Sequence, residues 1–367
     1  MTRVLHVSQA TGDGLDRFLT DIVSDQVHRG WTVGLACPAH APLQVLCEQL
    51  GASYERWPAR RRPGPSVVRE MRTLSRIIER WDPDVVHLHS SKAGLVGRLV
   101  VRGRRPTIFT PHAWSFLHEG AFTRGLSRAW ERWATRWTTI ALCVSEGERS
   151  RGEQAGVRAH FRVVHNAVDL ERFTPATAER RADLRDRLGL GAGPIAVCIG
   201  RFAPQKGQDV LLIAWPGVRA RVPDAFLVLL GDGPDRAALE RHANSSVMFA
   251  GHRDDVADWI VASDVVVQPS RWEGLSFVTL EAMACGRSVV ATDVDGMRDA
   301  LGEPLNTGAI VPVDDPEALA DAVANRLGDL TLAQREGACG RERATRFDLH
   351  AWGDEVAAVT LDTLGAP

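Results

Sequence analysis

Short apolar runs alternate with amphipathic segments along the first half of the chain. The segments at 15–29 and 67–80 repeat apolar residues every three or four positions, which is the period of a helix with one buried face. The apolar runs between such segments have the length of buried strands. They lie at 4–7, 32–36, 85–89, 107–110, 139–144 and 162–165. This alternation predicts a parallel sheet whose strands are joined by helices.

The same alternation starts again after residue 194. Its apolar runs lie at 195–200, 226–231, 247–250, 265–268, 288–291 and 308–311. Two such series predict an α/β protein with two doubly wound, Rossmann-like domains, each with its own core. A polar stretch ending in glycines and a proline separates them, so we expect a first domain at 1–173, a linker at 174–193 and a second domain at 194–347. We expect the helical segment at 348–367 to return to the first domain.

The composition is that of a globular protein, with 44% hydrophobic and 25% charged residues among 367. No apolar run approaches the roughly 18 residues of a membrane-spanning helix. The run at 4–7 begins at once, without the apolar core and cleavage site of a signal peptide. The six cysteines lie far apart and form no Cys-x-x-Cys pair. We therefore expect reduced thiols that hold no metal, in a cytoplasmic protein.

Charge is distributed unevenly along the chain. Residues 1–175 carry 25 Lys and Arg against 17 Asp and Glu, whereas the remainder carries 19 against 29. A basic first half suits an anionic acceptor, a membrane surface or nucleic acid. The chain has no recognised nucleic-acid-binding motif, so we expect no nucleic acid partner. Only Lys92 and Lys206 are lysines, and their compact ammonium groups make both candidates for specific contacts.

Two glutamates flank the start of a predicted helix in the second half. The apolar run at 265–268 is followed by a loop that carries Glu273, and Ser276 can cap the next helix, which contains Glu281. The carboxyl ends of parallel strands, and the helix N-termini after them, bind ligands and favour phosphate. Two carboxylates beside such a site suit a ligand with hydroxyls as well as phosphates. Two solvated surface glutamates would give the same spacing.

A basic loop follows the first strand of the second domain. Residues 200–207 read Gly-Arg-Phe-Ala-Pro-Gln-Lys-Gly. Arg201 can grip a diphosphate through its planar guanidinium, and Lys206 can do so as a point charge. The alternative is an ordinary basic surface loop.

Together these segments resemble the retaining GT-B glycosyltransferases of family four. The Glu-x7-Glu motif of that family matches Glu273 and Glu281, and its Gly-Arg-x4-Lys-Gly donor loop matches residues 200–207. Similarity extends over nearly the whole chain, at 83–94, 110–116, 231–234, 249–251 and 311–319. The resemblance implies two Rossmann-like domains that face each other across a cleft.

The resemblance also implies an activity. The chain would move a hexosyl-type sugar, with retention, from a nucleoside-diphosphate sugar to a hydroxyl of a glycan, a polyprenyl-linked or a small antibiotic-like acceptor. Arg201 and Lys206 would stabilise the leaving diphosphate, Glu273 would hold sugar hydroxyls and Glu281 the ribose diol. His112 would face the donor sugar from the first domain. Further donor-binding positions are implied at Gly14, Gly231, Gly251, Leu275, Ser276, Phe277 and Val278.

Neither a cofactor nor a metal ion is expected. Asp293-Val294-Asp295 is similar to the metal-binding Asp-x-Asp of another glycosyltransferase fold, but it follows a strand after which the GT-B family has its own loop. Departures from the family pattern are small. Asp13 replaces the first glycine of a common pair, and Ala113 replaces a frequent glycine. Each narrows the freedom of the backbone.

The segment at 122–137 carries two stripes. Phe122, Leu126, Trp130, Ala134 and Trp137 form an apolar stripe, opposite arginines at 124, 128, 132 and 136. As a helix this is strongly amphipathic, either with a core-facing apolar side or as a peripheral contact to an anionic membrane. For the activity, a non-hydrolysing sugar-nucleotide epimerase and a non-catalytic GT-B binding partner remain as alternatives.

Overall fold

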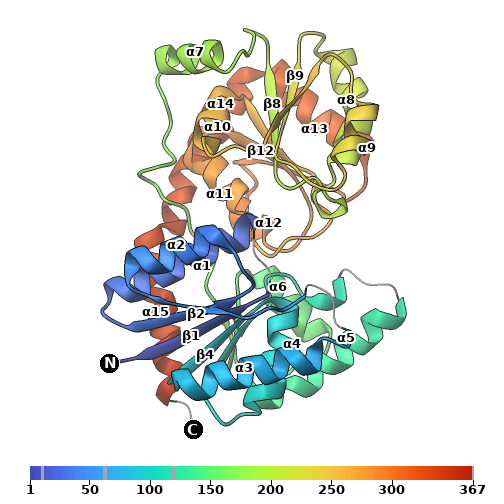
Figure 1. Ribbon diagram of the computed structural model, residues 1–367. Helices are drawn as coiled ribbons and strands as arrows, with labels where there is room; N and C mark the ends of the chain where they lie inside the picture. The colour runs from blue at the N-terminus through green and yellow to red at the C-terminus, as the bar shows by residue number, and fades with distance from the viewer. Residues whose placement is uncertain (10–11, 61–63, 118–120, 366–367) are drawn as a thin grey trace. The chain divides into compact units, whose positions relative to one another are not determined.

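The computed structural model describes residues 1–9, 12–60, 64–117 and 121–365, and the chain divides into two compact units. Unit 1 comprises Met1–Asn166 and His350–Pro367, and unit 2 comprises Ala167–Leu349. Each unit is built around one parallel sheet that is covered by helices (Figure 1). The predicted α/β class with two doubly wound sheets is confirmed.

Unit 1 contains a seven-stranded sheet in the order β3-β2-β1-β4-β5-β6-β7. Its strands are β1 (Arg3–Ser8), β2 (Thr32–Cys37), β3 (Ser53–Arg56), β4 (Val85–His89), β5 (Thr107–Thr110), β6 (Ile140–Cys143) and β7 (Phe161–Val163). Apolar runs predicted all of them except β3. That strand lies at an edge of the sheet and reads Ser-Tyr-Glu-Arg, so it has no apolar run to reveal it.

The helices of unit 1 form two cores on opposite faces of its sheet. They are α1 (Asp13–His28), α2 (Ala41–Leu50), α3 (Val67–Trp81), α4 (Ser90–Val101), α5 (Ala121–Ala134), α6 (Glu146–Gln154) and α15 (Leu349–Gly365). Leu19 of α1 and Leu43 of α2 pack with Leu35 of β2 on one face. On the other face, Leu74 of α3 and Val96 of α4 belong to a second cluster.

Helix α15 joins unit 1 although unit 2 precedes it in the chain. The ring edge of Trp352 contacts Phe18 of α1, with centroids 5.4 Å apart. Arg29 pairs with Asp354 at 2.6 Å. Gly353 is required here because a Cβ at this position would stand 2.4 Å from Asp25 Oδ1. These contacts fasten α15 to α1.

Unit 2 contains a six-stranded sheet in the order β10-β9-β8-β11-β12-β13. Its strands are β8 (Ile195–Ile199), β9 (Phe226–Leu230), β10 (Val247–Gly251), β11 (Val265–Gln268), β12 (Ser288–Thr292) and β13 (Gly308–Val311). The larger helices are α7 (Ala178–Arg187), α8 (Gln208–Arg221), α13 (Pro316–Gly328) and α14 (Leu330–Ala344). Shorter helices are α9 (Arg236–His242), α10 (Val256–Ala262), α11 (Phe277–Ala284) and α12 (Met297–Leu301). Trp215 and Leu319, on α8 and α13, are buried in its core.

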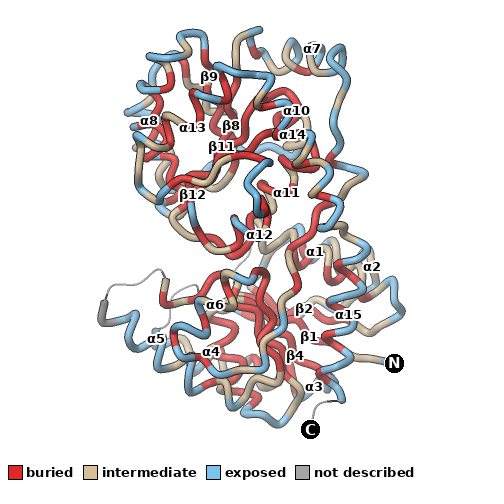
Figure 2. Tube along the Cα trace, turned by 180° about the vertical axis from the view of Figure 1, so that it is seen from behind, coloured by how far each residue is buried: buried red, intermediate tan, exposed pale blue. Residues whose placement is uncertain are grey.

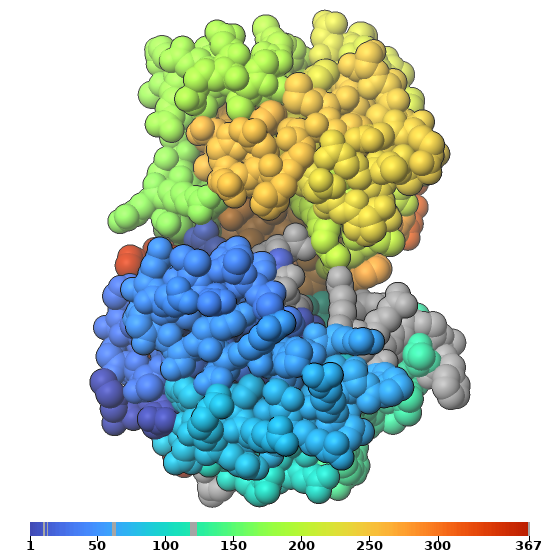
Figure 3. All heavy atoms as spheres, in the orientation of Figure 1, coloured from blue at the N-terminus to red at the C-terminus, as the bar shows by residue number. Residues whose placement is uncertain are grey.

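The expected linker at 174–193 contains helix α7, which is attached to unit 2. Arg185 Nη2 lies 2.8 Å from Asp264 Oδ2, and Arg181 pairs with the other oxygen of that carboxylate. Figure 3 shows α7, in lime green, on the surface beside α10, in orange. The polar composition that indicated a linker therefore belongs to an exposed surface helix.

Burial follows the sheets, as Figure 2 shows by the red of the strands against the pale blue of helix surfaces. All six cysteines are free, and five of them are buried. Within the described ranges, no helix is both long and apolar enough to cross a membrane.

Candidate functional site

Two predicted site residues meet at the carboxyl end of the sheet in unit 2. Strands β8 and β11 are neighbours in the sheet, so the loops that follow them lie side by side. Lys206 ends the short 3₁₀ turn after β8, and its Nζ lies 2.6 Å from Oε1 of Glu273 in the loop after β11. The Ser270 hydroxyl donates to the same oxygen at 2.7 Å. Glu273 is only 7% exposed, so this ion pair is largely removed from solvent.

Glycines bring the backbones of these loops into close contact. Gly207 adopts φ +65°, and a Cβ there would stand 2.0 Å from the carbonyl oxygen of Pro269. A Cβ on Gly231 would stand 2.2 Å from the carbonyl oxygen of Gly200. The Gly231 amide donates to the Gly251 carbonyl at 2.8 Å. The structure thus brings together the predicted glycines at the ends of β8, β9 and β10.

The start of α11 lies at the same end of the sheet. Ser276 is its N-cap, because its hydroxyl oxygen accepts from the Thr279 amide. The Ser276 hydroxyl also contacts Gln268 Oε1 at 3.2 Å, which anchors the cap to β11. The amides of the first helical turn have no intrahelical acceptors and, with the helix dipole, favour an anion. Of the remaining donor positions, Leu275 is buried, whereas Arg201, Phe277, Val278 and Glu281 are half-buried.

Arg271 supports this group of loops, and sequence reasoning missed it. Its guanidinium donates to Asp209 at 2.7 Å and to Asp314 at 2.7 Å, and its amide donates to the Gln205 carbonyl at 2.7 Å. The hydrogen bond from Arg271 helps to hold the pKa of the Asp209 carboxyl below its usual value, against a raising effect of burial. The one sequence signal was its place two residues before Glu273.

Asp293, in the Asp-x-Asp segment, forms an ion pair with an arginine side chain. The Arg298 guanidinium donates to both of its carboxylate oxygens, at 3.0 and 2.7 Å, beside the start of α12. With side chains 52% and 44% exposed, this bidentate ion pair lies on the surface of unit 2.

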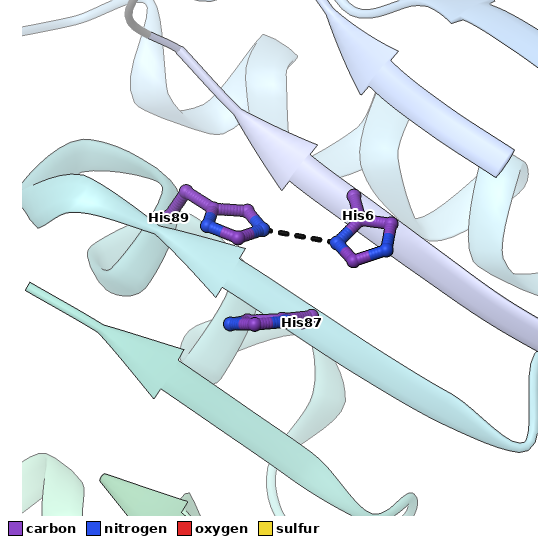
Figure 4. A group of neighbouring side chains, drawn as sticks. All are labelled: His6, His87 and His89. Atoms are coloured by element: carbon purple, nitrogen blue, oxygen red, sulfur yellow. Dashed lines mark hydrogen bonds between the residues drawn. The ribbon is translucent and has the colours of Figure 1, made fainter. Parts of the chain in front are cut away.

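In unit 1, His112 follows β5 and belongs to a group of histidines. Its Nε2 lies 3.2 Å from Nδ1 of His89, and the edge of the Phe18 ring contacts it with centroids 4.6 Å apart. His6, His87 and His89 lie on the neighbouring strands β1 and β4, where His6 pairs in register with His87 (Figure 4). Sequence reasoning missed these three residues. The i, i+2 spacing of His87 and His89, which places them on one face of a strand, was the available signal.

These histidines are neutral at pH 7. Burial lowers the pKa of His6 to about 4 and that of His112 to about 3. Burial also places the pKa values of His87 and His89 well below the usual value. His112 can therefore exchange hydrogen bonds with a ligand but brings no positive charge.

The backbone at His112 is unusual. His112 and Ala113 both have left-handed conformations, with φ of 50° and 82°. The buried carboxylate of Glu148 holds the turn: it accepts from the Ala113 amide at 2.6 Å and from the Val144 amide at 2.9 Å. The glycine frequent in the family would adopt this conformation without strain, whereas Ala113 keeps it only because its surroundings fix it.

Lys92 and Gly14 were also candidates from the sequence. Lys92 is not placed for a ligand: its Nζ lies 2.9 Å from Glu70 on α3, and both side chains are only 2% exposed. The lysine therefore joins α4 to α3. Gly14 lies half-buried in the first turn of α1.

Helix α5 is only partly buried (Figure 2). Ala134 is buried, and Trp130 and Trp137 are half-buried. Leu126, by contrast, is 66% exposed and Trp133 is 41% exposed. The side chain of Phe122 lies outside the described residues. The predicted core-facing stripe is therefore correct for its C-terminal part, and the other part adds apolar surface to the exposed arginines.

Two doubly wound sheets, with a basic loop and Glu273 at the carboxyl end of the second, are the arrangement expected of a GT-B glycosyltransferase. Residues 12–172 match the family described as Glycosyltransferase Family 4, and residues 193–329 match Glycosyl transferases group 1. The chain belongs to glycosyltransferase family four, a retaining family of nucleotide-sugar-dependent enzymes.

Relatives with named activities are similar over most of the chain. The GDP-mannose-dependent alpha-(1-6)-phosphatidylinositol monomannoside mannosyltransferase of Mycobacterium tuberculosis is 34% identical over 77% of this chain and 76% of its own. The UDP-Gal:alpha-D-GlcNAc-diphosphoundecaprenol alpha-1,3-galactosyltransferase of Escherichia coli is 26% identical over 81% of each chain. The alpha-D-kanosaminyltransferase of Streptomyces kanamyceticus is 34% identical over 62% of each.

Solved structures share the fold. Anabaena Alr3699/HepE, crystallised with UDP and glucose, has a TM-score of 0.84 at 21% identity and covers 98% of this chain and 99% of its own. Sucrose-phosphate synthase from Thermosynechococcus elongatus has a TM-score of 0.85 at 21% identity, over the whole of both chains. The GT-B fold is therefore shown over the full length.

Proposed function

We propose that the donor diphosphate binds in unit 2, at the start of α11 and the loop that carries Arg201 and Lys206. The observation that carries this proposal is the Lys206–Glu273 ion pair, because it joins the two motifs at the carboxyl end of the sheet. Lys206 and Arg201 then stabilise the negative charge that develops on the leaving diphosphate. Such electrostatic interactions are strong where water is excluded from the site. Glu273 binds hydroxyls of the sugar, and Glu281 binds the ribose diol.

The family resemblance assigns a further role to His112 of unit 1, which follows β5. As a neutral imidazole it supports a hydroxyl of the donor sugar without adding charge. Retention follows from attack on the same face of the sugar from which the diphosphate leaves, and a phosphate oxygen of the donor takes the acceptor proton. The bond from the anomeric carbon to the diphosphate breaks, and a bond to the acceptor oxygen forms.

The donor is identified by a thermal-shift series with UDP, GDP, ADP and their hexose derivatives. A ligand that binds only the native state raises the free energy of unfolding by about 2.7 kcal/mol at one hundred times its dissociation constant. We expect one nucleoside diphosphate to stabilise the chain, and Lys206→Ala to remove most of that shift. A shift that is unchanged in Lys206→Ala would contradict this assignment of the diphosphate site.

We propose that the acceptor is lipid-linked and that α5 contacts the anionic membrane surface that holds it. The exposed side chains of Leu126 and Trp133 support apolar contact. Arg124 and Arg128 supply positive charge on the same helix, and Arg136 does so in the 3₁₀ turn (Thr135–Trp137) that follows it. An arginine near such a surface contributes about 1 kcal/mol. A small soluble acceptor would require no contact between α5 and a membrane.

Sedimentation with vesicles tests the membrane contact. We expect salt-sensitive binding to vesicles that contain phosphatidylglycerol, little binding to phosphatidylcholine alone, and a clear loss in Arg124→Gln/Arg128→Gln. The control is Arg180→Gln/Arg187→Gln, which removes two arginines from α7 that are also exposed. Equal binding to both lipids, or equal losses in the two double variants, would favour a small-molecule acceptor.

A further inference from the structure

A chain of hydrogen bonds runs through the interior of unit 1 and ends at His112. Gln26 Oε1, on α1, lies 2.9 Å from Nε2 of His6 on β1. Nδ1 of His6 lies 3.0 Å from Nε2 of His89 on β4, as the dashed line in Figure 4 shows. Nδ1 of His89 lies 3.2 Å from Nε2 of His112. Gln26, His6 and His89 are fully buried, and both ring nitrogens of His6 and of His89 are used in this chain.

His6, His87 and His89 do not form a good metal site. Nitrogens of His6, His87 and His89 lie within 4.8 Å of one another. The rings of His87 and His89, however, are stacked with centroids 4.0 Å apart and planes 29° from parallel, so their in-plane lone pairs run side by side and do not converge. A cation would also have to break the His6–His89 hydrogen bond. Hydrogen bonding is the use that the geometry supports.

The proton positions in this chain are coupled. Each neutral imidazole carries one proton, so a ring that donates at one nitrogen must accept at the other. With Oε1 of Gln26 as the acceptor, His6, His89 and His112 all carry their protons on Nε2. Nδ1 of His112 is then a hydrogen-bond acceptor. If the Gln26 amide were flipped, its NH2 group would face Nε2 of His6 and donate to it. The protons of all three histidines would then lie on Nδ1, so the orientation of the Gln26 amide sets the tautomer.

The location of His112 is fixed independently of this chain. Glu148 holds the left-handed turn at His112 and Ala113 through the Ala113 amide, and Phe18 packs against the imidazole ring. Loss of Gln26 would therefore change where the proton of His112 lies more than where its ring lies. This distinction separates a tautomer effect from a general loss of structure.

We propose that Gln26, His6 and His89 are positioning residues that keep His112 as its Nε2–H tautomer, with Nδ1 free to accept a hydrogen bond from a hydroxyl of the donor sugar. The inference rests on the proposed function for the role of His112, but the tautomer itself can be measured without substrate. With the other tautomer, Nδ1 of His112 would carry a hydrogen and donate to the hydroxyl oxygen, so the hydroxyl proton would lose this acceptor. The reversed hydrogen bond weakens stabilisation of the transition state.

The first experiment is long-range ¹H–¹⁵N NMR of the imidazole nitrogens in ¹⁵N-histidine-labelled protein. We expect His6, His89 and His112 to share the Nε2–H tautomer, assigned with single histidine variants. Gln26→Met should give a mixture at His112, whereas Gln44→Met, at an exposed position on α2, should leave the tautomer unchanged. An Nδ1–H tautomer at His112 in the wild type, or an unchanged tautomer in Gln26→Met, would overturn the proposal.

The second experiment is a double-mutant cycle on the transfer reaction. We expect Gln26→Met to lower kcat at least tenfold with little change in KM for the donor, and to have no further effect in a His112→Ala background. Gln44→Met, an exposed glutamine on α2, is the control and should retain full activity. A loss that persists in His112→Ala would show that Gln26 acts only through general structure. If the chain transfers no sugar at all, the proposed function fails while the NMR result still decides the tautomer.

Discussion

Lys206 offers the sharpest test of the donor site, because its structural and catalytic contributions differ in size. Lys206→Ala leaves the Glu273 carboxylate with the Ser270 hydroxyl but without its ammonium partner. Breaking a fully buried pair costs about 3–5 kcal/mol, whereas an exposed pair contributes about 0–1 kcal/mol. The two side chains here are 18% and 9% exposed. We therefore expect the free energy of unfolding to fall by about 1–3 kcal/mol.

The effect on catalysis should be larger. Loss of one group that stabilises developing charge typically costs about 2.7–4 kcal/mol in the barrier, or roughly a hundred- to a thousandfold in kcat. The assay is transfer at saturating donor, at a temperature where urea unfolding shows that the variant is folded. Glu273→Gln/Lys206→Met is the matched variant, because it removes both charges: stability should partly recover while transfer stays low. A transfer rate within threefold of the wild type in Lys206→Ala would refute the role of Lys206 at the diphosphate.

The remaining predictions concern both units. Glu281→Gln should weaken inhibition by the nucleoside diphosphate, whereas Glu273→Gln should impair transfer and leave diphosphate binding nearly intact. Between pH 6.5 and 4, a histidine such as His6 is protonated in the unfolded chain but stays neutral in the folded chain, because burial lowers its pKa to about 4. The free energy of unfolding should therefore fall, as pH falls, by about 1.4 kcal/mol per pH unit for each such histidine. Ala113→Gly should relieve a left-handed conformation and stabilise the chain by up to about 1 kcal/mol. Lys92→Met should destabilise it by about 3 kcal/mol or more, because Glu70 loses its buried partner.

Each of these outcomes has a control. The pH slope should be unchanged in His252→Gln, which alters an exposed imidazole, and a flat profile in the wild type would contradict the neutral histidines. Ala155→Gly, in an ordinary right-handed conformation, should destabilise where Ala113→Gly stabilises. Equal binding and kinetic defects in the two glutamate variants would defeat their division of roles. If Lys92→Met left stability unchanged but impaired transfer, the result would indicate that Lys92 contacts a ligand.

Much of the fold follows from local sequence. Strands such as β8 and β9 are continuous apolar runs, which are typical of buried parallel strands. Strand β3 could not be found in this way, because an edge strand needs fewer apolar residues. Helix α7 was taken for a linker because the signal there is polar. Its attachment depends on Asp264, which lies far away in the sequence.

The candidate site shows the same division between local and distant information. The loops that carry Lys206 and Glu273 could be predicted separately, but their contact depends on β8 lying beside β11. His87 and His89 were visible as a spaced pair, whereas the link to His6 requires β1 to lie beside β4. Lys92 was correctly singled out as unusual. Its burial against Glu70 could not be predicted, because that partner belongs to a different helix.

The membership of α15 in unit 1 has a consequence for biosynthesis. The segment Ala167–Leu349 separates the main part of unit 1 from its last helix. At roughly 5–20 residues per second, a ribosome needs about 10–40 s to make that segment. During this interval Phe18 and the rest of the α1 surface lack their contact with Trp352, because α15 has not yet been made. Unit 2, by contrast, can fold from a continuous stretch of chain. Unit 1 thus begins first and is completed last, and the α1 surface that α15 covers stays exposed until that helix is made.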